Sequence, residues 1–309
     1  MAQIVNTPSY VKDVAATEGL MSQRRRRMII AFLFILPALI NFTLFRYLPI
    51  IASFRTSLYQ YSLLGGYGSF IGFEHYTRLI HDPVFWKSLG VTTRFVIYKV
   101  PIQIVLSLGL AMLVQRETFG AGVVRSAILT PMVTSIIILS ILWAMMYHSQ
   151  LGLIQSILGI FGIPHLSILS NPNRALIGIT IMMIWKDLGF SMIILLAGLK
   201  GIPGEYYDAA LVDGANKWQA FTQITVPLLK PVLMFVIVTQ TVFSFQVFVP
   251  VYQMTKGGPL DSTKAIVYYI YQQGFSYQDM GYASALAMVT LAILLVISYF
   301  QMRFLRAEA

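Results

Sequence analysis

Charged and polar side chains interrupt two of the long apolar stretches of this sequence. Lys186 and Asp187 stand together inside the apolar run 175–196, with Trp185 before them and Phe190 after them. A charge in hydrocarbon costs on the order of 2.5–3.5 kcal/mol on insertion scales, so such residues usually face a cavity or a partner. Two interpretations follow. Either the pair lines a cavity and contacts a polar solute, or it lies near a membrane surface. In the second case Lys186 and Asp187 neutralise each other or pair with Lys99.

A second polar cluster falls in the apolar run 232–254. Its members are Phe243, Ser244, Gln246, Val247 and Phe248, which lie within about two helical turns. In a continuous helix Phe243, Gln246 and Val247 would share one face, because they are spaced i, i+3 and i+4. Aromatic faces beside an amide suit a sugar, which combines apolar C–H faces with many hydroxyls. Packing would also explain these residues, since polar side chains form hydrogen bonds between membrane helices.

The segment 205–227 separates these two apolar runs and is amphipathic and charged. A short helix is expected to begin after Pro203-Gly204, with Glu205 and Asp208 in its first turn, where carboxylates oppose the positive end of the helix dipole. A second short helix is expected after Gly214, which permits a turn that a residue with a Cβ resists.

Small side chains in the same segment leave its backbone accessible. Ala209 and Ala210 present almost no side chain. Asp213 comes directly before the turn at Gly214. Pro227 and Pro231 mark the boundary with the next apolar helix. An exposed helix–turn–helix between two membrane spans suits docking to a soluble partner. The alternative is a solvated loop with ordinary helix caps.

The composition predicts a polytopic membrane protein. Only 11% of the 309 residues are charged, against roughly 25% in soluble domains, and 57% are hydrophobic. The net charge of +10 comes from Lys and Arg that flank apolar runs rather than forming a basic face. It therefore favours contact with anionic lipid on the cytoplasmic side and not with nucleic acid. Without cysteine, the chain forms no disulfide and no thiolate-held metal site.

Six membrane spans are expected, which would place both termini on one side. They cover about 28–45, 91–116, 126–147, 175–196, 232–254 and 282–300. The first run is long enough to remain as a membrane helix, and no small-residue cleavage site follows it. The cluster Arg24–Arg25–Arg26–Arg27 should hold the N-terminus in the cytoplasm. This orientation also places the segment 205–227 in the cytoplasm.

The motifs of several enzyme classes are missing. No phosphate-binding loop of the G-x-x-x-x-G-K-[ST] type and no Gly-x-Ser-x-Gly motif occurs. The four histidines fall in the expected external segments without zinc-protease spacing. We therefore predict no catalytic residue and no metal site, and any ATP that drives the protein would be hydrolysed by another polypeptide.

The segment 205–227 resembles the loop of ABC-importer permease subunits that carries a Glu-Ala-Ala…Gly pattern followed by Ile-x-Leu-Pro. Here the pattern stands as Asp208-Ala209-Ala210, then Gly214, then Ile224-x-Val226-Pro227. Two positions depart from it: Asp208 replaces Glu and shortens its reach, and Val226 replaces Leu. The resemblance covers most of residues 28–305. It also rests on Gly72-Phe73-Glu74-His75-Tyr76, Asp82-Pro83-Val84-Phe85-Trp86, Gly152-Leu153-Ile154-Gln155, Trp185-Lys186-x-Leu188-Gly189-Phe190, Thr255-Lys256-Gly257-Gly258-Pro259 and Tyr268-x-Ile270-Tyr271.

These motifs are similar to those of the maltose-type, binding-protein-dependent sugar permeases. The resemblance implies an all-α membrane protein with six transmembrane helices, the type I ABC importer permease fold and cytoplasmic termini, in the bacterial inner membrane. It implies a cytoplasmic tail at 1–27, a first helix and external loop at 28–86, and a permease core at 87–303. The coupling loop would cover 198–230, and a C-terminal tail would cover 304–309.

The resemblance also implies partners and site residues. The partners are a second homologous permease, an ATPase dimer that binds ATP and Mg²⁺ so that this chain binds no cofactor, and an extracytoplasmic solute-binding protein. The coupling residues would be Glu205, Asp208, Ala209, Ala210, Asp213, Gly214 and Pro227. Substrate contacts are assigned where this sequence matches the family's substrate-binding positions, or from the two polar clusters described above. They would be Met183, Lys186, Asp187, Phe190, Phe243, Ser244, Gln246 and Val247.

The function implied is ATP-driven import of a sugar or sugar-like solute. Lys186, Asp187 and Val247 differ in character from the maltose-binding pattern. Maltose is therefore doubtful, and an anionic solute such as a uronate oligosaccharide or glycerol phosphate is the alternative. An ion-coupled secondary transporter would need several carboxylates within its spans, and only Asp187 is available.

Overall fold

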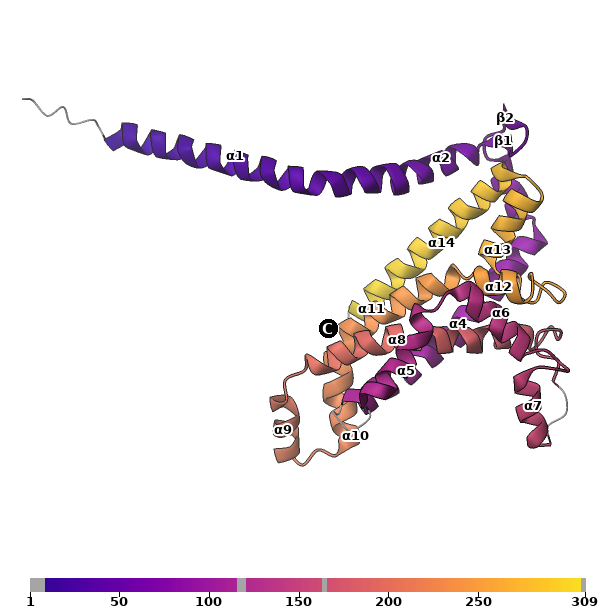
Figure 1. Cartoon of the computed structure of the whole chain (residues 1–309). Coiled ribbons are helices and arrows are strands. Elements are labelled where there is room, and N and C mark those ends of the chain that lie inside the picture. The colour runs from indigo at the N-terminus through magenta and orange to yellow at the C-terminus, as the bar shows by residue number, and fades with distance from the viewer. Residues whose placement is uncertain (1–8, 116–120, 163–165, 307–309) are drawn as a thin grey trace, which may run out of the picture. The chain divides into compact units, whose positions relative to one another are not determined.

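A computed structural model describes residues 9–115, 121–162 and 166–306, and the chain divides into two compact units between Arg55 and Thr56. In the first unit α1 (Ser9–Phe42) continues through a π-helical turn (Thr43–Tyr47) into α2 (Leu48–Thr56) (Figure 1). Arg46 lies within this turn and does not end the helix. The helix therefore extends beyond both ends of the predicted span 28–45.

The second unit begins with a β-hairpin and continues as helices of unequal length. In chain order its elements are β1 (Tyr59–Ser62), β2 (Gly66–Phe70), α3 (Glu74–Ile80), α4 (Pro83–Gln115), α5 (Ala121–Val133), α6 (Ile136–Met146), α7 (Leu153–Ile160), α8 (Ala175–Lys200), α9 (Glu205–Val212), α10 (Lys217–Ala220), a π-helical turn (Phe221–Thr225), α11 (Val226–Phe245), α12 (Val249–Met254), α13 (Ile266–Tyr271), a second π-helical turn (Gln272–Ser276) and α14 (Met280–Arg306).

Several helices are long and apolar enough to cross a membrane. By length and composition these are Arg25–Thr56, Pro83–Gln115, Ala175–Lys200, Lys217–Met254 and Met280–Phe304. The helices α5 and α6 meet at an angle of 101° and would together make a sixth span. Within the described residues the chain is therefore a mainly helical membrane protein with five or six candidate spans.

The span expected at 126–147 consists of two helices, because α5 ends at Val133 and α6 begins at Ile136. Pro131 has no N–H to donate within α5, and Thr134 donates its backbone N–H to the Pro131 carbonyl in a tighter turn (3.3 Å). Ser135 then takes an extended conformation (ψ 127°), so the chain changes direction there.

The all-α prediction is wrong for the β-hairpin, which occupies part of the expected external loop. Its strands pair antiparallel, with Tyr59 opposite Phe70 and Tyr61 opposite Tyr67. The facing rings lie 5.2 Å and 4.5 Å apart between centroids. Cross-strand aromatic pairs of this kind stabilise a β-hairpin.

The core of the second unit is organised around α8, which packs along α4 and contacts α5 and α11. Met182, Met192 and Leu195 on α8 are fully buried. A Cβ at Gly189 would lie 2.7 Å from the Ile128 carbonyl oxygen of α5, so only glycine permits this approach. Figure 1 shows α9 and α10 joining one end of α8 to α11, with α12 and α13 at the other end of α11.

Candidate functional site

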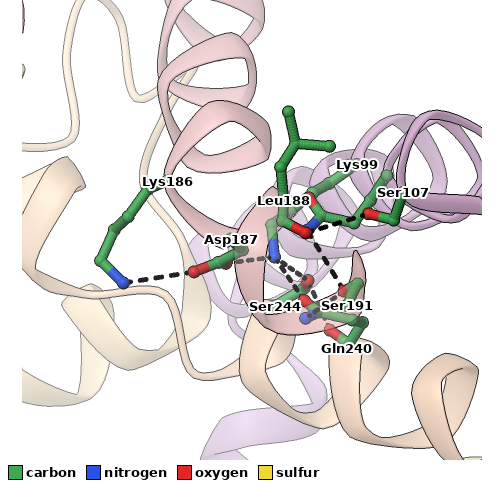
Figure 2. Close-up of polar contacts among 9 residues, drawn as sticks. Lys99, Ser107, Lys186, Asp187, Leu188, Ser191, Gln240 and Ser244 are labelled. Carbon is green, nitrogen blue, oxygen red and sulfur yellow. Dashed lines mark hydrogen bonds and ion pairs between the residues drawn. The ribbon is translucent and has the colours of Figure 1, made fainter. Parts of the chain in front are cut away.

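Three charged residues meet where α4 and α8 pack together. Lys99 Nζ on α4 lies 2.8 Å from Asp187 Oδ2, and Lys186 Nζ lies 3.2 Å from Asp187 Oδ1. Figure 2 shows the Asp187 carboxylate between the two ammonium groups. The Lys99 side chain has no exposed surface, whereas the side chains of Lys186 and Asp187 keep 18% and 14%. Lys99 is therefore an internal counter-charge, and the other two remain within reach of a solute.

The remaining ammonium hydrogens of Lys99 are donated to acceptors on α11. Its Nζ donates to Gln240 Oε1 (2.9 Å) and to Ser244 Oγ (3.3 Å). With Asp187 these make three acceptors for three ammonium hydrogens, which is the arrangement that a buried Lys requires. This one side chain thus connects α4, α8 and α11.

A hydrogen-bond network extends from this point toward α8. Gln240 Nε2 donates to Ser191 Oγ (3.0 Å), and Ser107 Oγ on α4 donates to the Leu188 carbonyl (3.4 Å). Ser244 Oγ donates in turn to the Gln240 carbonyl of its own helix (2.6 Å). All these side chains except Asp187 and Lys186 are buried, so the network fixes the wall behind the two partly exposed charges.

A cavity of about 450 Å³ opens in front of this wall. Its lining combines two charged groups and two amides with three phenylalanine rings and aliphatic side chains. The lining residues are Met132, Ile136, Met183, Lys186, Asp187, Phe190, Gln240, Phe243, Gln246, Val247, Phe248, Val249 and Pro250. The rings of Phe190 and Phe243 lie 6.1 Å apart between centroids. A cavity with aromatic walls and a few polar groups is typical of a binding site for a small polar molecule.

The predicted substrate residues are brought together, with one exception. Lys186, Asp187, Phe190, Phe243, Gln246 and Val247 all line the cavity, whereas Ser244 is fully buried and bonded to Lys99. The sequence interpretation did not include Lys99 and Gln240 in the site. The sequence left open whether Lys186 and Asp187 line a cavity or pair with Lys99, and in the structure Asp187 does both.

The prediction that Phe243, Gln246 and Val247 share one continuous helix face is wrong. The helix α11 ends at Phe245, and α12 starts at Val249 with Pro250 in its first turn. A proline favours the first turn of a helix because its missing N–H is not needed there. The break lies beside the cavity, where irregular backbone is tolerated at membrane depth.

The predicted loop 205–227 forms the two short helices that were expected. Glu205 and Asp208 occupy the first turn of α9, and Gly214 has a φ of +79°, a conformation that favours glycine. Asn216 and Gln219 form a reciprocal capping box that starts α10 (2.8 and 2.9 Å).

The surface between α9 and α10 is hollowed. A depression of about 440 Å³ is lined by Ala209, Ala210, Asp213 and Gly214, among others, and the nearby side chains of Leu211, Val212 and Trp218 are 74%, 87% and 70% exposed. Pro227 lies in the first turn of α11. The assignment of these residues to ATPase coupling stays a prediction, as does the assignment of the cavity residues to substrate.

Comparison with known proteins identifies the family. Residues 103–307 match the model of the binding-protein-dependent transport system inner membrane component. Three curated relatives are each 34% identical to this chain. They are the sulfoquinovosyl glycerol transport system permease protein of Agrobacterium fabrum (91% of each chain covered), the trehalose/maltose transport system permease protein of Thermococcus litoralis (86% of this chain and 90% of the relative) and the lactose transport system permease protein of Rhizobium radiobacter (93% and 97%).

A solved structure supports the fold. The bacterial alginate ABC transporter, crystallised in complex with an alginate pentasaccharide-bound periplasmic protein, contains a chain that aligns with a TM-score of 0.78. The alignment covers 90% of this chain and 94% of that chain at 24% identity. From the family match over two thirds of its length and from these relatives, the chain belongs to the inner membrane components of binding-protein-dependent ABC transport systems.

Proposed function

We propose that this chain is one of two membrane-spanning permease subunits of an ATP-driven importer for a saccharide. The observation that carries the proposal is the cavity in which Lys186, Asp187 and Gln246 stand beside the rings of Phe190 and Phe243. Polar groups can bond sugar hydroxyls, and aromatic rings can cover the C–H faces of a sugar. The names of the three relatives, which refer to transport of sugars or a glycosyl glycerol, agree with this solute class.

The proposed assembly contains this chain, a homologous second permease, two ATPase subunits and an extracytoplasmic binding protein. The chain would cross the inner membrane six times, with both termini and the segment 198–230 in the cytoplasm. The exposed α9–α10 surface suits a groove of the ATPase, because Ala209 and Ala210 allow close approach while Asp208 offers a charge. This chain would bind neither ATP nor Mg²⁺ itself.

The proposed mechanism is alternating access. Closure of the ATPase dimer on ATP would move α9 and α10 as a rigid body, and the two permeases would open toward the binding protein and accept its solute. A ligand-driven change of this kind requires an assembly with two discrete states.

An acidic saccharide is the second candidate, and the charge of the cavity wall favours it. Two ammonium groups, Lys99 and Lys186, stand against the single carboxylate of Asp187. All three ammonium hydrogens of Lys99 are donated to groups inside the protein, so Lys186 is the group that can turn toward an anionic solute. By contrast, Asp187 is the single carboxylate within the candidate spans of the described residues, which gives ion-coupled transport little support.

Reconstitution tests the proposal. The chain, its sibling permease, the ATPase and the binding protein are placed in liposomes, and ATP-dependent uptake of labelled trehalose, lactose and arabino-oligosaccharide is measured. We expect uptake of a saccharide only with all four components and ATP. Uptake by the chain alone, or labelling of an α9 cysteine variant from the external side, would contradict the proposal.

A further inference from the structure

A row of aromatic rings leads away from the cavity along α12, α13 and the following π-helical turn. The ring of Phe248, which lines the cavity, lies 5.5 Å from Tyr252 and 5.1 Å from Tyr271 between centroids. Tyr252 and Tyr271 are themselves 5.5 Å apart, so Tyr252 lies beside the path that leads from Phe248 to Tyr271. Tyr271 in turn stacks on Phe275 at 5.2 Å. We call Phe248, Tyr252, Tyr271 and Phe275 the aromatic row.

Two rings of the row are exposed, and the other two, Phe248 and Tyr271, are half-buried. Tyr252 is 36% exposed and Phe275 is 57% exposed, so both rings keep open surface. Tyr268 lies beneath the row, 7% exposed, with its ring 6.4 Å from Phe248 and 6.5 Å from Tyr271. The row is therefore backed by the core and open on its other side, and Tyr268 supports it.

The chemistry of the row matches a saccharide. Its rings offer apolar faces and edges for sugar C–H groups, while Tyr252 and Tyr271 add hydroxyls that both donate and accept hydrogen bonds. Successive rings about one sugar unit apart would offer a chain of similar weak contacts. Such contacts hold a solute without trapping it, which transport requires.

We propose that the aromatic row is a sliding route along which a saccharide passes between the outer surface near Phe275 and the cavity at Phe248. This inference rests on the proposed function, because it takes the saccharide as cargo and the α12–α13 end as the outer side. It adds a route that starts at Phe248 in the cavity lining and continues over Tyr252, Tyr271 and Phe275, which lie outside that lining.

Substitutions that remove a ring test the route. Tyr271→Leu and Phe275→Leu are compared with Tyr271→Phe, which keeps the ring, in the four-component liposomes with labelled trehalose, lactose and arabino-oligosaccharide. Phe300→Leu is the matched control, because Phe300 stacks on Phe304 in α14 away from the cavity (6.1 Å). Co-purification of all subunits verifies assembly, and Phe275, being exposed, is the safer variant if Tyr271→Leu does not assemble.

We expect the initial uptake rate, at subsaturating loaded binding protein, to fall roughly fivefold in each leucine variant of the row. It should fall less than about twofold in Tyr271→Phe, which loses only the hydroxyl, and stay at the wild-type level in Phe300→Leu. Wild-type rates in Phe275→Leu and Tyr271→Leu, or an equal loss in Phe300→Leu, would overturn the route while leaving the proposed function intact. Absence of ATP-dependent uptake of all three sugars, and of a labelled uronate disaccharide, by the wild-type complex would instead overturn the proposed function and the route with it.

Discussion

Lys99 Nζ lies 2.8 Å from Asp187 Oδ2, and this bond joins two helices that the sequence separates by several loops. The lysine is fully buried, while the aspartate reaches the cavity. The pair therefore separates two tasks. Lys99 neutralises and orients Asp187 from behind, so that the other carboxylate oxygen and Lys186 can face a solute.

Removing Lys99 should destabilise the subunit. In Lys99→Met the Asp187 carboxylate keeps only the partly exposed Lys186, and Gln240 and Ser244 lose their donor. Breaking one side of a buried ion pair costs about 3–5 kcal/mol. We expect a lower unfolding midpoint in detergent and a smaller yield of assembled complex.

The double variant Lys99→Met/Asp187→Leu supplies the control for this effect. It removes both charges, so it should regain much of the lost stability while remaining defective in uptake. A double variant as unstable as Lys99→Met would show that the ion pair is not the cause.

Replacing Lys186 should change selectivity and not stability. In Lys186→Gln, Asp187 keeps its bond to Lys99, so the unfolding midpoint should stay near that of the wild type. If the cargo is acidic, the KM for uptake of a labelled uronate disaccharide should rise about three- to tenfold, because the contact of a partly exposed charge contributes on the order of 1 kcal/mol. The KM for lactose should change less than about twofold. Equal changes for both sugars would contradict the acidic-saccharide candidate.

Reversing the charge of Asp208 should uncouple ATP hydrolysis from uptake. Asp208→Lys changes the first turn of α9, on the exposed surface proposed to meet the ATPase. We expect ATPase activity of the complex to continue while uptake falls at least about tenfold, corresponding to a loss of ~1.4 kcal/mol in the coupling step. The matched control is Glu74→Lys, which reverses an exposed carboxylate in the first turn of another short helix, α3. Normal uptake by Asp208→Lys would refute the coupling role.

The effect of a substitution at Gly214 should depend on how readily the new residue adopts the left-handed backbone conformation. Its φ is +79°, and an added Cβ would meet no atom within 4 Å, so the penalty is conformational and not steric crowding. A β-branched residue there costs roughly 1–2 kcal/mol, and asparagine costs less. Binding of the purified ATPase to the permease pair should therefore weaken in Gly214→Val and be nearly normal in Gly214→Asn. Equal binding by both variants would argue against a rigid turn at the interface.

Acid should loosen the contacts of Asp82, which precedes α4. Burial alone raises the pKa of this carboxyl, but hydrogen bonds from the hydroxyls of Tyr269 and Tyr282 and from the backbone N–H of Val84 outweigh burial, so the pKa lies below its ordinary value of 3.8. A lowered folded-state pKa gives stability that is complete above the ordinary value and is lost as the pH falls through the folded value.

The measurement is the unfolding midpoint of the purified complex between about pH 6 and pH 3. The wild type should lose stability at the acid end, and Asp82→Asn should be less stable at neutral pH but flatter with pH over the acid end. Identical pH profiles would show that Asp82 makes no contribution.

Local signals in the sequence were sufficient for much of the fold. Apolar length predicted the positions of the candidate membrane spans. Pro203-Gly204 and Gly214 correctly predicted where α9 begins and where the chain turns before α10. The polar residues inside the apolar runs also marked the cavity, since Lys186, Asp187 and Gln246 all line it. These features depend on the conformational preference of each residue and on the free-energy cost of burying its polar groups. Both are properties of the residue type and depend little on distant parts of the chain.

Only the tertiary structure decided which distant residues meet and where the helices break. The burial of Ser244 behind the cavity, the bend between α5 and α6 and the break after Phe245 were not evident from local patterns. The pairing of Lys99 with Asp187 was only one of two interpretations that the sequence offered, and the structure selected it. Which counter-charge lies beside a buried charge depends on how the helices pack. An apolar helix ends or bends where neighbouring helices can satisfy its free backbone groups. Both depend on the arrangement of α4, α8 and α11 in space, which no single stretch of sequence contains.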